Sequence, residues 1–284
     1  MCDMRAKSLN VPEYWDTIWG REVSLAENRY NIARSERSAR WKRIDQAVVK
    51  TFGGFRGLRA IEIGAGQGST AALMAARGAA VTVLDNSEAS IDNSRRFFAG
   101  LGLSAEFALE NALNIGPSLK GQYDIAMSFG LAEHFAGENR KRIIAAHFDV
   151  LKDRGLAFIS VPNKWNPPYR LYKCLAELKG SWPVEEYPFS RVELRAILRE
   201  AGIQDYYFFG DSIAESASWL YSLTYKVNPM VLWRRVAGTP PSFDVSRAKQ
   251  YRGTALDEYF SYSLVVCGRP PVAHGHELNI PGTA

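Results

Sequence analysis

The chain has 284 residues, of which 46% are hydrophobic and 23% are charged. This composition excludes a disordered or fibrous chain and allows one large core. The formal net charge of +5 is modest, and the basic residues are scattered rather than interleaved with aromatic ones, so we predict no nucleic-acid partner. The three cysteines, Cys2, Cys174 and Cys267, are too widely spaced for a metal-binding or disulfide pattern, which predicts reduced thiols and no metal.

The N-terminus lacks the apolar core of a signal peptide, and there is no apolar run of about 18 residues. We therefore expect a cytoplasmic protein without an integral membrane segment. No linker rich in Pro, Gly or Ser divides the chain, which favours one domain with insertions over two domains.

Residues 11–50 precede the first predicted core strand. An aromatic stripe at helical spacing opens this region, formed by Tyr14, Trp15, Ile18 and Trp19. Residues 28–50 then predict one charged amphipathic helix. These helices either pack on the core as a cap or cover a ligand, and in the second case Tyr14, Trp19 or Arg34 would contact it.

The rest of the chain is organised around a glycine turn. The pattern predicts a buried strand over 60–63, a helix over 69–77 and a second strand over 80–84. Between the first strand and the helix, Gly64, Gly66 and Gly68 alternate, and glycine lets a ligand lie against the backbone. Asp85 ends the second strand, where an acid can hold a ribose diol.

The glycine spacing narrows the choice of ligand. A dinucleotide fingerprint requires a glycine at position 69, which is Ser69, and a phosphate-binding loop requires a lysine that this turn lacks. The free N–H groups at the start of the following helix point at whatever occupies the turn. An ordinary turn without a ligand is the alternative.

Further elements follow in chain order. The periodicity predicts a helix from Ser87 to Gly100, strands over 104–109 and 122–128, a helix over 139–151, a turn over 151–155, a strand over 156–161, a helix over 191–201 capped by Ser190, and strands over 203–209 and 259–267.

Glu62, the three glycines and Asp85 together resemble motif I of the class I S-adenosylmethionine (SAM)-dependent methyltransferases. Residues 128–134 resemble the loop after the family's fourth strand, where Leu-Glu-His is frequent and this chain has Leu-Ala-Glu-His. Asn111 stands where many members carry an acid that accepts a hydrogen bond from adenine. An amide oxygen can still accept that bond, without the charge.

This resemblance covers about residues 58–210 and the last strand. It implies an α/β fold, with a seven-stranded, mostly parallel, doubly wound sheet of the Rossmann-like methyltransferase type. We expect a helical N-terminal cap over 1–55, a SAM-binding domain over 56–268 and a flexible tail over 269–284. Cap segments, helical and aromatic, would be inserted over 162–190 and 211–257.

The resemblance also implies that SAM is the cofactor. Its ribose would lie on Asp85, its adenine near Asn86 and Asn111, and its methionyl end near Glu62 and Gly64. The predicted cofactor-binding residues are Tyr14, Trp19, Glu62, Gly64, Ala65, Gly66, Gly68, Asp85, Asn86, Asn111, Ala112, Ser128, Gly130 and Leu131.

Three residues are candidates for catalysis. His134 has an ordinary pKa near 6.5, which suits a general base, although Glu133 and His134 could instead only position their loop. Tyr169 and Tyr172 lie one helical turn apart, where they could pack an apolar acceptor, shield the sulfonium or hold a nucleophile. A cap without substrate contact is the alternative.

The predicted function is in-line methyl transfer to a small, partly apolar molecule, by a monomer or homodimer. One alternative is a SAM-consuming enzyme that cyclises SAM or transfers its aminocarboxypropyl group and releases methylthioadenosine. A second alternative is a non-catalytic SAM-binding protein that acts through the amphipathic insertion over 211–257. For that insertion we favour a cap on the core or a dimer surface over contact with a membrane surface.

Overall fold

The structure is a computed structural model that describes residues 12–20, 24–180, 182, 184–211 and 256–271. The prediction for the insertion over 211–257 therefore lies outside the described residues except at its two ends, and that for the tail lies outside them from residue 272 onward. Among the described residues, no helix is both long and apolar enough to cross a membrane.

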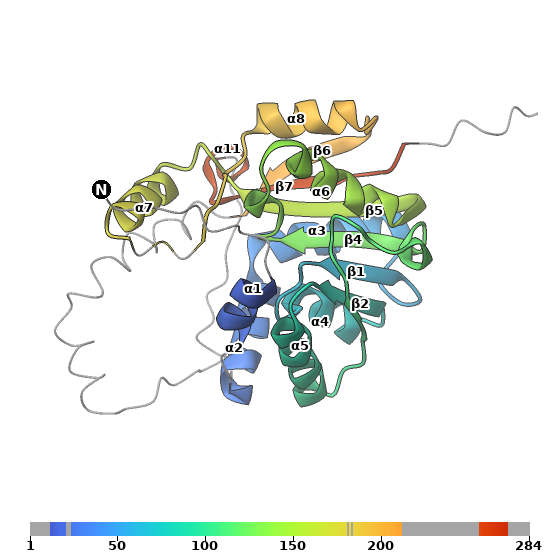
Figure 1. The fold of residues 1–284 in the computed structure, drawn as a ribbon. Helices are drawn as coiled ribbons and strands as arrows, with labels where there is room; N and C mark the ends of the chain where they lie inside the picture. Colours follow the sequence, from blue (N-terminus) through green and yellow to red (C-terminus); the bar gives the residue numbers. More distant parts are fainter. Residues whose placement is uncertain (1–11, 21–23, 181, 183, 212–255, 272–284) are drawn as a thin grey trace, which may run out of the picture.

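One seven-stranded sheet crosses the molecule, with helices on both of its faces (Figure 1). Its strands are β1 (Arg59–Ile63), β2 (Ala80–Asp85), β3 (Glu106–Leu109), β4 (Tyr123–Phe129), β5 (Leu151–Pro162), β6 (Tyr206–Gly210) and β7 (Ser263–Gly268). They lie in the order β3-β2-β1-β4-β5-β7-β6, and β7 alone among them runs antiparallel to its neighbours. The predicted α/β, mostly parallel, doubly wound sheet is confirmed.

The helices of the described part cover the sheet and its carboxyl edge. They are α1 (Pro12–Trp19), α2 (Leu25–Arg37), α3 (Ala39–Phe52), α4 (Ser69–Ala76), α5 (Glu88–Leu101), α6 (Gly137–Asp149), α7 (Pro167–Leu178), α8 (Arg191–Glu200) and α11 (Asp257–Phe260), with short 3-10 turns η1 (Pro117–Leu119) and η2 (Ala132–His134).

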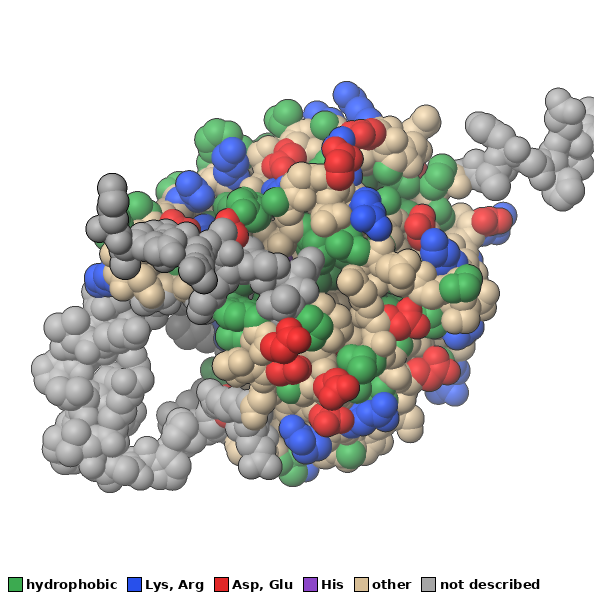
Figure 2. All heavy atoms as spheres, viewed as in Figure 1, with side chains coloured by type: hydrophobic (Ala, Val, Ile, Leu, Met, Phe, Trp, Pro, Cys, Tyr) green, Lys and Arg blue, Asp and Glu red, His purple; other side chains and the backbone are tan. Residues whose placement is uncertain are grey.

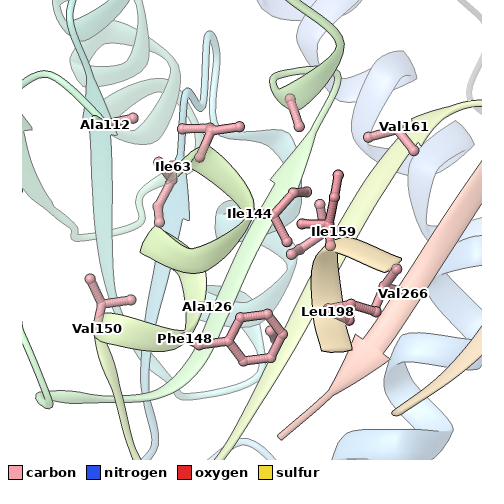
Figure 3. Packing of buried hydrophobic residues seen from close by; sticks show 14 of the residues in the cluster. Ile63, Ala112, Ala126, Ile144, Phe148, Val150, Ile159, Val161, Leu198 and Val266 are labelled. Atoms are coloured by element: carbon pink, nitrogen blue, oxygen red, sulfur yellow. The ribbon is translucent and has the colours of Figure 1, made fainter. Parts of the chain in front are cut away.

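Two hydrophobic clusters fill the space on either side of the sheet. On one side, Ile144 and Phe148 of α6 and Leu198 of α8 pack with Ile159 and Val266 of the sheet (Figure 3). On the other side, α3, α4 and α5 bury their apolar faces. Burial of one such side chain contributes about 1.5–3 kcal/mol to the stability of the fold, so the packed sheet is a rigid base for the residues at its edge.

On the face seen in Figure 2, acidic and basic side chains are interspersed.

The region predicted as one helix over 28–50 is two helices, so that prediction was wrong. Ser38 ends α2 with an extended backbone (φ −66°, ψ 151°), and its hydroxyl accepts a hydrogen bond from Trp41 N at the start of α3. A serine hydroxyl can replace a missing intrahelical bond, so it favours a cap over a helix interior. The predicted caps at Ser87 and Ser190 are confirmed, because each hydroxyl accepts from a backbone N–H three residues on.

Two predicted strand boundaries were also wrong. Residues 151–155 are part of β5 rather than a turn, and the register between β4 and β5 shifts there between Tyr123 and Ile125. The last strand begins at Ser263 rather than at 259, because α11 occupies 257–260. The side-chain amides of Asn163 and Asn166 donate to carbonyls of that helical turn, a contact across more than 90 residues of sequence.

Candidate functional site

A cavity of about 120 Å³ lies where β1, β2 and β4 end. Its wall is formed by Trp15 and Trp19 of α1, Gly64 and Ala65 of the glycine turn, Leu84, Asp85 and Asn86 at the end of β2, Glu110, Asn111 and Ala112 after β3, and Phe129, Gly130, Leu131, His134 and Phe135 after β4. Carboxyl ends of parallel strands are the usual ligand site of such sheets. Nine of the fourteen predicted cofactor-binding residues and the predicted base, His134, thus meet at one cavity wall.

The glycine turn requires its three glycines. Gly64, Gly66 and Gly68 have φ values of +61°, +55° and +73°, which strain any other residue. Side chains pack tightly over the first two: a Cβ built on Gly64 would lie 2.5 Å from Leu131 Cδ1, and one on Gly66 would lie 2.3 Å from Trp19 Cζ2. The absence of side chains on these glycines therefore lets Leu131 and Trp19 pack directly against the backbone of the turn, which they cover.

Gly68 plays a different part, as the N-cap of α4, and a Cβ there would approach Val83 and Phe98 of the core. It is not in the cavity wall, so its predicted role in cofactor binding stays a prediction.

Asp85 is 6% exposed and lies in the cavity wall. Its Oδ2 accepts from Gly66 N (2.9 Å) and its Oδ1 accepts from Ser87 N (3.1 Å). Burial raises the pKa of the carboxyl, and these backbone bonds offset only part of that rise. Each carboxylate oxygen has a second lone pair, so Asp85 can brace the turn and still accept hydroxyl groups from a ligand.

Glu62 lies behind the glycine turn and not in the cavity wall. Its Oε2 accepts from Ala71 N (2.7 Å) in the first turn of α4. Burial raises its pKa to about 7, against the lowering effects of that bond and of the Arg40 charge. Glu62 therefore ties the turn to α4, and its predicted contact with the cofactor stays a prediction.

His134 lies in η2, and its side chain is in the cavity wall. Its Nδ1 is 3.2 Å from the carbonyl oxygen of Glu185. Because a carbonyl only accepts, we infer that Nδ1 carries the hydrogen and that the lone pair is on Nε2. Burial lowers the pKa, and the Lys173 charge adds to this, outweighing the carbonyls of Glu185 and Gly130. The imidazole is thus held neutral with a lone pair that can take a proton.

The two predicted tyrosines lie outside the cavity wall. Tyr169 is fully buried on the inner side of α7, where its hydroxyl donates to Glu186 Oε1 (2.7 Å) and burial raises its pKa. Tyr172 packs edge-on against Trp182, with ring centroids 5.9 Å apart. Both belong to the packing between α7 and the segment before α8, and their predicted catalytic roles stay predictions.

Three other predicted residues lie in surroundings that the sequence did not indicate. Asn111 lines the cavity, and its side-chain oxygen accepts from Leu113 N (2.9 Å), so its predicted bond to adenine would use the second lone pair and stays a prediction. Ser128 is fully buried in β4, and its hydroxyl has no hydrogen-bond partner within the described ranges. Tyr14 packs edge-on against Trp15 and is not in the wall.

Arg40 is a residue that sequence reasoning missed. From α3, its guanidinium lies over the ring of Phe129 (4.9 Å to the centroid), its Nη1 donates to Ser160 Oγ (3.4 Å), and its Nε is 3.7 Å from Asp211. With Arg34 it lines a second hollow of about 290 Å³ on the other flank of the glycine turn. Ser160 is 120 residues away in sequence, so no local pattern could have indicated this contact.

The rest of the cavity wall comes from residues that the sequence analysis did not name as cofactor-binding or catalytic. Aromatic rings are contributed by Trp15, Phe129 and Phe135, and a carboxyl by Glu110. Within the part of the chain that the structure describes, no group of three His, Cys, Asp or Glu side chains could hold a metal ion.

The chain is similar to known proteins in sequence and in fold. Residues 60–155 match a family model described as a methyltransferase domain. The chain is 27% identical over 157 residues to a ubiquinone biosynthesis O-methyltransferase of Pseudomonas savastanoi pv. phaseolicola, a match that covers 53% of this chain and 66% of that protein. It is 28% identical over 189 residues to the protein of that name in Brucella anthropi, covering 64% and 75%. The chain thus spans slightly less than two thirds of the pseudomonad relative.

Solved structures share the fold. The magnesium protoporphyrin IX methyltransferase of Synechocystis PCC 6803, with bound S-adenosylhomocysteine (SAH), superposes with a TM-score of 0.53 at 17% identity, over 90% of this chain and 93% of that one. A putative sarcosine dimethylglycine methyltransferase of Galdieria sulphuraria gives a TM-score of 0.50 at 18% identity, over 81% and 84%. At these identities the likeness concerns the fold alone.

Proposed function

We propose that the chain, as a class I SAM-dependent methyltransferase, binds SAM at the glycine turn and transfers the methyl group to a small, partly apolar molecule. The observation that carries this proposal is the meeting of the glycine turn, Asp85 and His134 at one cavity wall. The relatives' name, O-methyltransferases of ubiquinone biosynthesis, supports a small-molecule acceptor and an oxygen as the methylated atom.

The residues present fit the cofactor. The turn offers backbone without side chains, and the free lone pairs of Asp85 would accept the ribose hydroxyls. Asn86 and Ala112 would flank the adenine, while the rings of Trp15, Trp19 and Phe129 would lie near the sulfonium, which aromatic faces attract. When bound, SAM supplies an electrophilic methyl group on a positively charged sulfur.

The chain's own part in the reaction is alignment, exclusion of water and removal of a proton. The leaving thioether is neutral, so no strong charge stabilisation is needed at the sulfur. The aromatic wall keeps water from the reacting atoms. His134 would take the acceptor's proton on Nε2, while the Glu185 carbonyl holds Nδ1–H and fixes the ring.

The proposal is tested with purified full-length chain and SAM alone, with nucleoside products followed by mass spectrometry and SAH binding by calorimetry. Binding of SAM and SAH without turnover, followed by SAH release when acceptors such as phenols and amines are screened, is the expected result. Steady release of methylthioadenosine would instead favour cyclisation or aminocarboxypropyl transfer. Failure to bind either SAM or SAH would overturn the proposal.

The first variant to test is Asp85→Ala. It should weaken SAH binding by about 1–3 kcal/mol, because hydrogen bonds from the ribose hydroxyls to a carboxylate would be lost. Calorimetry on Asp92→Ala, which removes an exposed carboxylate on the neighbouring helix α5, gives the matched control. Equal SAH affinity in folded Asp85→Ala and wild type would remove Asp85 from the site.

Arg40→Met tests whether Arg40 binds the amino-acid end of the cofactor rather than its nucleoside end. We expect it to weaken SAH by roughly 1.5–3 kcal/mol, the worth of a hydrogen bond to a charged group, since the guanidinium would hold the cofactor's carboxylate. Methylthioadenosine, which lacks the amino-acid end, should bind both proteins equally. Arg43→Met is the control, because Arg43 lies on the same helix but reaches the Gly210 carbonyl and the Phe209 ring. An equal loss for both ligands would show that Arg40 only supports the fold.

A further inference from the structure

Helix α1 lies over the cavity and packs mainly against α5. It has eight residues, and none of them is fully buried. A helix of this length has little stability of its own in water. Its docked position therefore depends on its packing against α5 and on specific contacts, three of which involve the candidate site.

The first contact joins α1 to the acid at the end of β2. Asp16 Oδ1 accepts from Ser87 Oγ (2.6 Å) and from Ala89 N (3.1 Å), so it binds the first turn of α5. Ser87 N in turn donates to Asp85 Oδ1. Ser87 is fully buried, and its two hydrogen bonds connect the carboxylate of Asp16 to the carboxylate of Asp85.

The second contact places α1 on the glycine turn. The ring of Trp19 lies directly over Gly66, and the Trp19 carbonyl accepts from the side chain of Asn93 on α5 (3.3 Å). Asn93 is 5% exposed. The end of α1 is thus fastened to the body of the protein beside the turn that would carry the cofactor.

The third contact reaches the candidate base. Trp15 packs edge-on against His134, with ring centroids 5.0 Å apart and an interplanar angle of 67°. Both rings are in the cavity wall. Together with the Glu185 carbonyl, Trp15 restricts the imidazole, and withdrawal of α1 would remove that restriction and admit water.

We propose that α1 is a clamp in which Asp16 fastens the helix to the Ser87–Asp85 side of the cavity while Trp15 positions His134. This proposal rests on the proposed function. A cofactor in the cavity would give Trp15 and Trp19 new apolar contacts and so would favour the docked helix. By linkage, any residue that favours the docked helix must also favour the bound cofactor. Asp16 and Trp15 are therefore positioning residues for cofactor and base, rather than surface residues of an ordinary cap.

The test uses SAH as the probe and needs no acceptor. Calorimetry gives the affinity, and hydrogen–deuterium exchange reports on the amides of 12–20. In wild type, SAH should slow that exchange. Asp16→Ala should weaken SAH about tenfold, the cost of a charge-assisted hydrogen bond, and should lose the protection. Asp16→Asn should stay within about threefold, because an amide oxygen can accept both bonds.

Glu13→Ala is the matched control, since Glu13 is an exposed acid on the same helix whose side chain makes no contact with the site. Circular dichroism shows whether each variant folds. If Asp16→Ala failed to fold, the exchange data on wild type would still decide the matter, because unchanged exchange of 12–20 when SAH binds would overturn the clamp.

The contact with the base has its own readout. The imidazole signals of His134, identified by His134→Gln, give its pKa by NMR titration. We expect a value below 6.5 in wild type, a rise toward 6.5 in Trp15→Ala, and recovery in Trp15→Phe, whose ring can restore the edge-on contact. The charge of Lys173 on α7, which also lowers the pKa of His134, is unchanged in all of these variants.

The outcomes separate the two proposals. Wild type that binds neither SAM nor SAH would overturn the proposed function and the clamp with it. Wild type that binds SAH, with the same affinity and exchange in Asp16→Ala, would overturn the clamp alone. An unchanged His134 pKa in folded Trp15→Ala would show that Trp15 does not position the base.

Discussion

Replacement of His134 by alanine is expected to lower kcat by about 10²–10⁴-fold, the usual contribution of a positioned general base. The reason is geometric: the side chain lies in the cavity wall, Nδ1–H is held by the Glu185 carbonyl, and Nε2 keeps its lone pair. His134→Gln should lose as much, because glutamine has similar size and polarity but cannot act as a base near neutral pH. The measurement is the rate of SAH formation with an acceptor found by the screen.

The pH profile supplies a second check on His134. Burial lowers its pKa below 6.5, so the neutral, basic form persists to lower pH than usual. Wild-type kcat/KM should therefore rise with pH through a value below 6.5 and be level above pH 7. His134→Gln should lack that acidic limb. A preserved rate in a variant that folds and binds SAH would show that His134 only holds its loop.

Replacement of Glu62 by glutamine is expected to remove a large pH-dependent part of the stability. Burial raises the folded-state pKa from 4.5 to about 7. Between these values the folded protein keeps the proton and the unfolded chain loses it. The stability from the protonated carboxyl is thus complete below pH 4.5 and is lost as pH rises toward 7. The difference corresponds to roughly 3 kcal/mol.

Urea unfolding of wild type and Glu62→Gln at pH 5 and pH 8 measures this effect. Asp85, Glu133 and Glu186 also have raised pKa values, so only the difference between the two proteins isolates Glu62. Glutamine can still accept the bond from Ala71 N, which keeps the turn attached to α4. Glu88→Gln, at an exposed site on α5, is the control. Parallel pH dependence in wild type and Glu62→Gln would contradict the expected titration.

Much of the fold could be predicted from the sequence alone, because it depends on interactions between residues that are close together in the chain. Alternating glycines after an apolar run require positive φ values, which the structure has at Gly64, Gly66 and Gly68. The caps at Ser87 and Ser190 depend on residues three positions apart. Asp85 follows its strand directly, so its place at the sheet edge could be predicted. These features are set by neighbours in sequence, and the resemblance to a family then supplied the seven-stranded, mostly parallel sheet and the loop with His134.

Tertiary packing alone decided which side chains face the cavity. The aromatic stripe of α1 indicated Tyr14 and Trp19, but the docked helix places Trp15 in the wall beside Trp19. Arg40 reaches the ring of Phe129, which lines the cavity, only because α3 crosses near the ends of β4 and β5. Tyr169 is buried because α7 turns it inward. Periodicity determines that a helix has an apolar face, but the angle at which that face docks depends on partners far away in sequence.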